Sequence, residues 1–224
     1  MSLTGTHEVF ASIDEGALNA VLEAFFDARP RRRCYGSPIF VPTTTVDATE
    51  IPAIAFPGVP GGIGWRIGFT TPVVDLFEQT QPLPPGLSLE PGQFSLRTEV
   101  ELCVNCVARK DVRGEAAVAR SARASRPDHV VCAKIGVFGI GHLDVWNSPS
   151  GDGAVRLRVD RVELVDIRPD ALETVLECVI KMILDGVLST IELPLRALRA
   201  GAFELIVEEG PEIAHDCIQA FGNV

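Results

Sequence analysis

Residues 170–192 read DALETVLECVIKMILDGVLSTIE, and their apolar side chains recur at helical spacing. Asp170 follows Pro169 and can cap a helix, and Pro194 ends it. At about 100° per residue, the polar side chains fall in an arc of roughly 120°, namely Glu173, Thr174, Glu177, Lys181, Asp185 and Glu192. Most of the remaining circumference is apolar, which is more than a surface helix needs. The segment therefore predicts a long helix that other elements wrap.

The chain before this helix favours strands, because the apolar period over residues 36–167 shifts toward two. Residues 129–146 read as one long strand, and three glycines inside it indicate bends or close approach of another element: Gly136, Gly139 and Gly141. The alternation in residues 154–167 slips by one residue after Val159, which is typical of a β-bulge. Long, bent, bulged antiparallel strands build a strongly curved sheet.

A short helix and a hairpin are predicted near the two ends of the chain. A short helix is expected from Ser12, which forms a capping-box pattern with Glu15, to the residues just before Pro30. A closing hairpin is expected around residues 209–211. The sequence thus predicts one α+β domain over residues 1–224. In this domain a strongly curved antiparallel sheet is wrapped around a long C-terminal helix, with a short N-terminal helix.

Composition and charge limit the partners. Hydrophobic residues make up 46% of the chain and charged residues 22%, as in a folded protein. The net charge of -10 argues against nucleic acid and anionic membranes, which are bound mainly through Lys and Arg. Two local groups of basic residues, at positions 29–33 and 109–126, are interpreted as solvated surface.

The N-terminus and the cysteines indicate the compartment. Residues 1–14 lack the basic and apolar regions of a signal peptide, and no segment is long and apolar enough to span a membrane. A cytoplasmic protein is therefore expected, with export by a route without a signal peptide left open. Its six cysteines, which are Cys34, Cys103, Cys106, Cys132, Cys178 and Cys217, should be mostly reduced.

No motif in the chain indicates catalysis, a cofactor or a metal. Cys103 and Cys106, together with Cys132 and either His129 or His142, offer zinc ligands. However, residues three apart on a strand point to opposite faces, so free thiols are predicted instead of a shared metal or a disulfide. The glycine-rich runs at 58–64 and 136–141 do not lie between a strand and a helix, which phosphate binding requires. We therefore expect no enzyme activity.

The order of elements resembles one known family. The first helix reads Ile-x-x-x-x-Leu-Asn-x-x-Leu through Ile13, Leu18, Asn19 and Leu22, long bent strands follow, and a broadly apolar helix precedes a proline and closing strands. This resembles the tubular lipid-binding (TULIP) superfamily, which includes bactericidal/permeability-increasing protein, SMP domains and bacterial P47-like proteins. The resemblance implies a twisted sheet around a long helix, with an elongated apolar channel between them for acyl chains.

Non-enzymatic binding of a lipid or another elongated apolar ligand is the function that this resemblance implies. The expected channel walls come from both helices: Leu18, Leu22, Phe25, Val179, Met182, Ile183 and Val187. The alternative is a scaffold or toxin-accessory protein of the same fold with a filled core, which acts through contacts with a second copy or another protein. A filled core is expected to carry bulky residues where this chain has Gly136, Gly139 and Gly141.

Overall fold

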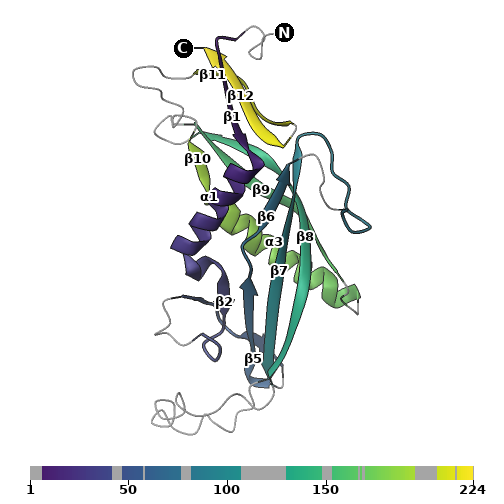
Figure 1. Cartoon of the computed structure of the whole chain (residues 1–224). Helices are drawn as coiled ribbons and strands as arrows, with labels where there is room; N and C mark the ends of the chain where they lie inside the picture. Colours follow the sequence, from purple (N-terminus) through teal and green to yellow (C-terminus); the bar gives the residue numbers. More distant parts are fainter. Residues whose placement is uncertain are drawn as a thin grey trace. The chain divides into compact units, whose positions relative to one another are not determined.

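The fold is α+β, as predicted, with two α-helices and a strongly curled, mostly antiparallel sheet in the described part of the chain (Figure 1). A computed structural model describes residues 7–41, 47–57, 59–76, 82–106, 130–147, 153–165, 167, 170–194, 206–214 and 216–223. The residues divide into two compact units. The first comprises Met1–Phe25, Pro72–Thr98 and Gly136–Val224, and the second comprises Phe26–Thr71 and Glu99–Ile135.

The larger sheet has the strand order β10-β9-β8-β7-β5-β2-β3, with β6 paired to β7 and β4 paired to β5. Its strands in the first unit are β6 (Val73–Leu76), β9 (Gly153–Leu164) and β10 (Glu192–Pro194). Those in the second are β2 (Cys34–Gly36), β3 (Thr49–Glu50), β4 (Ile54–Phe56) and β5 (Val59–Phe69). Strands β7 (Gln93–Cys106) and β8 (Val130–Asn147) contribute residues to both units. Only the short β2–β3 pair is parallel among the pairings described.

The predicted bulge lies in the pairing of β8 with β9. Ile140 pairs with Arg161 and Gly141 pairs with Val159, so Asp160 is the extra residue. Of the three glycines predicted to leave space on β8, Gly139 and Gly141 do not do so, whereas a Cβ atom on Gly136 would meet only Cβ of Val165, at 4.0 Å. A Cβ atom on Gly141 would lie 2.5 Å from Cζ of Phe94, and one on Gly139 would lie 3.0 Å from Cγ of Leu96. Buried side chains of β7 therefore fill this space.

Helix α3 (Asp170–Leu188) packs against β9 and confirms the predicted C-terminal helix. It ends four residues earlier than expected, because Glu192–Pro194 pairs with β9 as β10. One face is buried through Ile180, Leu184, Val187 and Leu188. The opposite side is exposed, so the described residues do not wrap the helix on most of its circumference.

The N-terminal helix α1 (Glu15–Ala28) begins three residues later than predicted. Residues Val9–Asp14 form strand β1, because they pair with β12 (Cys217–Asn223). The backbone N–H of Ala17 donates to Oδ1 of Asp14 at 2.7 Å, so Asp14 caps the helix instead of Ser12. Strand β11 (Ile206–Ala214) completes a three-stranded sheet with the order β1-β12-β11.

A closing hairpin is present, but it is not the predicted one, because its two strands are β11 and β12 and residues 209–211 do not form its turn. Gly210 and Pro211 lie inside β11, where the pairing with β12 shifts between Glu209 and Glu212. The chain reverses next to Asp216, whose φ of 59° is left-handed. A short polar residue is among the few non-glycine types that adopt this conformation readily.

Side chains of both helices satisfy the backbone of strand edges. Asn19 of α1 accepts from the N–H of Val74 and donates to its C=O, both at 2.8 Å. Asp185 of α3 accepts from the N–H of Val159 at 3.0 Å. The polar arc of α3 thus lies partly against β9, where its carboxylates protect a strand edge from pairing with another chain.

The change Asn19→Ala is expected to lower the free energy of unfolding by about 1–3 kcal/mol, because both backbone groups of Val74 lose their partner. The matched control is Glu23→Ala, one turn further along α1 at an exposed position, with an expected change within about 0.5 kcal/mol. Urea unfolding of both variants measures the difference. Equal losses would show that Asn19 does not anchor α1 to β6.

Candidate functional site

The seven predicted wall residues belong to the first unit but differ widely in exposure. Leu18 and Leu22 are 0% exposed, and Val187 is also buried. Phe25, Val179 and Ile183 are half-buried, whereas Met182 is 64% exposed. None of the seven lines either of the two cavities described below. Their role as channel walls stays a prediction.

An apolar cavity of about 180 Å³ lies between the three-stranded sheet and the β9–β10 edge of the first unit. It is partly open to solvent. Strands β1, β9, β10, β11 and β12 line it, with the residues Ala11, Ser12, Ile13, Val155, Leu193, Pro194, Pro211, Ile218, Gln219 and Ala220. None of these side chains is charged.

The pairing of β1 with β12 explains why space remains here. Directly opposed residues on antiparallel strands share one face of the sheet. Ala11 pairs with Ala220, and Ile13 pairs with Ile218. The alanine pair is therefore followed on the same face by a pair of much larger side chains, and its short side chains leave a hollow that Val155 and Leu193 border.

The polar groups of the cavity wall are few. Ser12 and Gln219 pair with each other one residue along, so they belong to the opposite face of the sheet. The amide of Gln219 donates from Nε2 to Oε1 of Glu212 at 2.7 Å. The arrangement offers apolar contact and little hydrogen bonding, which suits a hydrocarbon group and not a charged one.

Sequence reasoning missed this site because its residues come from both ends of the chain. The sequence prediction places Ile13 in the first helix, although polar Ser12 and Asp14 alternate with apolar Ala11 and Ile13 as in a strand. Ile218 and Ala220 show the same alternation. That periodicity indicates two strands, but it does not indicate that they pair.

A second, polar cavity of about 280 Å³ lies between β9 and α3, with the lining residues Arg161, Val162, Glu163, Thr174, Glu177, Cys178 and Lys181. Glu163, Glu173 and Glu177 bring carboxylate oxygens within 4.8 Å of one another. Desolvation raises the pKa of Glu163, and the charges of Glu177 and Glu173 raise it further. The three carboxylates are close enough to share a cation, but no other observation points to a ligand.

The cysteines differ from the prediction of free thiols in one pair. Cys103 forms a disulfide with Cys132, with an S–S distance of 2.06 Å, so the expectation of free thiols at these positions was wrong. His142 contacts Asp160 instead of a cysteine, with Nδ1 2.8 Å from Oδ2. The side chain of Cys106 and all of His129 lie outside the described residues. Cys34, Cys178 and Cys217 are free.

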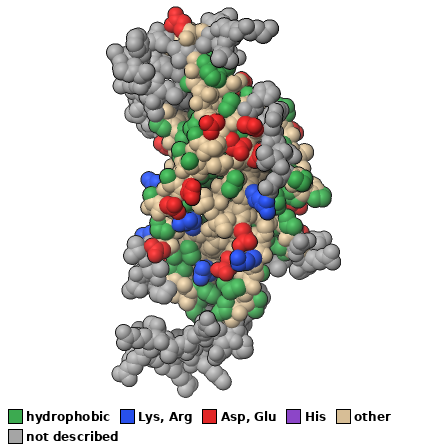
Figure 2. Space-filling model, in the orientation of Figure 1, with side chains coloured by type: hydrophobic (Ala, Val, Ile, Leu, Met, Phe, Trp, Pro, Cys, Tyr) green, Lys and Arg blue, Asp and Glu red, His purple; other side chains and the backbone are tan. Residues whose placement is uncertain are grey.

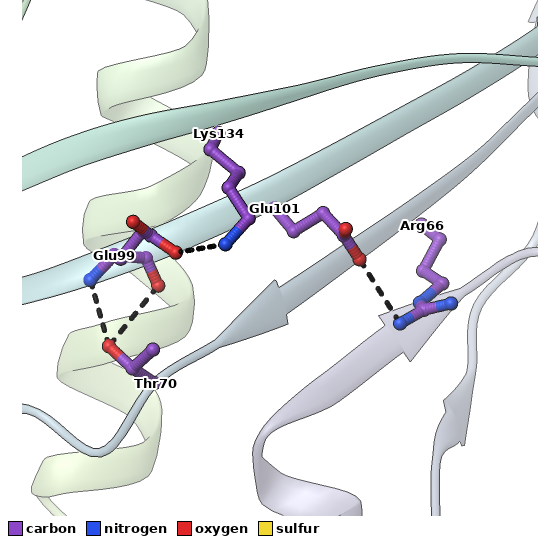
Figure 3. Close-up of polar contacts among 5 residues, drawn as sticks. All are labelled: Arg66, Thr70, Glu99, Glu101 and Lys134. Atoms are coloured by element: carbon purple, nitrogen blue, oxygen red, sulfur yellow. Dashed lines mark hydrogen bonds and ion pairs between the residues drawn. The ribbon is translucent and has the colours of Figure 1, made fainter.

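A network of charged side chains lies on the sheet of the second unit (Figure 3). Lys134 of β8 donates to Glu99 of β7 at 2.9 Å, and Arg66 of β5 donates to Glu101 of β7 at 3.3 Å. The hydrogen bond from Lys134 to the Glu99 carboxylate, with the charge of that group, raises the pKa of the ammonium. Because opposite charges pair across neighbouring strands, the network is explained by strand pairing.

Acidic and basic side chains are interspersed with apolar ones on the face shown in Figure 2. Among the described residues this face therefore shows no extended basic patch. None of the described helices is long and apolar enough to cross a membrane.

The comparisons with known proteins give no family. No protein-family model matches the chain, and no curated protein matches it. The fold class is therefore set by the curled, mixed sheet and the packed C-terminal helix alone.

Proposed function

We propose that the protein binds an apolar ligand, such as a lipid, without transforming it. The observation that carries this proposal is the apolar cavity between the β1-β12-β11 sheet and the β9–β10 edge. Burial of hydrocarbon surface contributes about 25 cal/mol per Å², and it requires no catalytic group and no cofactor. The resemblance to tubular lipid-binding proteins supports the same function. However, the resemblance implies a channel between the long helix and the curved sheet, whereas the cavity lies beside the three-stranded sheet.

One observation favours the alternative function, a scaffold that acts through protein contacts. Val175, Cys178 and Met182 form an exposed stripe on α3, and apolar stripes of this kind are typical of contact surfaces. The tightly filled space around Phe94 and Leu96 agrees with that alternative as well. The apolar cavity is the feature that the alternative leaves unexplained.

The predicted cytoplasmic location is opposed by the disulfide. Disulfides such as Cys103–Cys132 are typical of oxidising compartments and rare in the cytosol. We therefore propose that the protein acts in an oxidising environment.

Uptake of a fluorescent fatty-acid analogue by delipidated protein tests the proposed function. Saturable binding with one site per chain is expected, together with apolar mass that remains bound in native mass spectrometry. Protein that takes up no probe, carries no apolar mass and forms stable oligomers would favour the scaffold instead.

A further inference from the structure

The size of the cavity limits what part of a ligand it can hold. Its volume of about 180 Å³ is close to that of an engineered apolar cavity of about 150 Å³ that binds benzene. A group of about six carbon atoms therefore fits, whereas a whole long-chain lipid does not.

The lining determines which end of such a lipid can enter. None of the lining residues is charged, so a carboxylate or phosphate inside would have no ionic partner. Burial of an unpaired charged group is strongly unfavourable. The polar end of a lipid must consequently remain outside.

The burial of the lining residues gives the cavity a direction. Val155, Ile218 and Ala220 are buried, whereas Pro194 is exposed. The cavity is also partly open to solvent. A linear chain can therefore enter with one end and leave its remainder outside.

We infer that this cavity holds the methyl end of a single acyl chain, with the charged headgroup outside. The inference rests on the proposed function, since it specifies how an apolar ligand is held. Its site is formed by Ala11, Ile13, Val155, Leu193, Ile218 and Ala220, none of which is among the predicted channel walls.

Calorimetric titrations with dodecanoate and dodecanedioate test the inference. The two ligands have the same chain length, but dodecanedioate carries a carboxylate at both ends. If the methyl end is buried, dodecanedioate must bury a charge and should bind at least about 100-fold more weakly. Benzene, which has no headgroup, should compete with dodecanoate.

Two substitutions of an alanine by leucine locate the binding site. Ala11→Leu fills part of the cavity and should abolish dodecanoate binding, whereas Ala214→Leu, on β11 of the same sheet but outside the cavity, should retain it. A thermal melt of each variant verifies that it is folded. If Ala11→Leu fails to fold, Ala220→Leu fills the same cavity from the opposite strand.

Each outcome separates the inference from the proposed function. Equal affinity for both acids, or dodecanoate binding that survives in the folded cavity-filling variant, would overturn the inference and leave the function standing. Binding of benzene but not of dodecanoate would do the same, because the cavity would then accept only small free molecules. Binding of none of the three ligands would overturn both.

Discussion

The change Ile180→Ala is expected to lower the free energy of unfolding by about 2–5 kcal/mol, because it removes a fully buried side chain from the contact of α3 with the sheet. Met182→Ala, two residues along the same helix, should change it by no more than about 0.5 kcal/mol, because Met182 is exposed. Both substitutions shorten a large apolar side chain to alanine, so they differ mainly in burial. Urea unfolding of the two variants measures the contrast.

Ligand uptake by a variant of the exposed face of α3 tests whether that face lines the binding site. Met182→Glu should fold and should still take up the fatty-acid probe, because its carboxylate stays in water and Met182 does not line the apolar cavity. Loss of uptake in a folded Met182→Glu variant would favour the channel that the sequence predicted. Similar losses of stability in Ile180→Ala and Met182→Ala would show that something covers the exposed face.

Removal of the disulfide should lower the free energy of unfolding about as much as Ile180→Ala. The bond joins residues 29 positions apart, and closing a loop of this length stabilises the folded state by about 3–4 kcal/mol in the chain-entropy model. The double variant Cys103→Ala/Cys132→Ala should therefore unfold at a lower denaturant concentration than the wild type. The exposed, free Cys178 provides the control, Cys178→Ala, which should leave the midpoint unchanged.

A reductant gives an independent check of the disulfide. Reduction should shift the unfolding midpoint of the wild type toward that of the double variant and leave the double variant unchanged. Identical midpoints for the oxidised wild type and the double variant would contradict a stabilising role for the bond between Cys103 and Cys132.

Long elements with a strong period could be predicted from the sequence. Helix α3 shows an unbroken apolar period over five turns, and the bulge after Val159 follows from a change of phase within one strand. Both signals are local, so each can be read within one segment of the chain.

Features that depend on distant pairing could not be predicted. Ser12 and Asp14 are both good helix caps, and the choice between them is made by the pairing of Val9–Asp14 with residues 217–222. Strand parity predicts opposite faces for Cys103 and Cys106, but it does not give the register between β7 and β8 that brings Cys103 to Cys132. The cavity has the same origin, because Ala11 and Ala220 are opposed only through that register of the terminal strands.

The ligand position can be measured directly by NMR of protein labelled at the isoleucine methyl groups, before and after addition of dodecanoate. The cavity predicts shifts at Ile13 and Ile218, which line it, and little change at Ile180 and Ile183 of α3. Shifts at Ile183 with none at Ile13 and Ile218 would place the ligand beside α3 and contradict binding in the cavity.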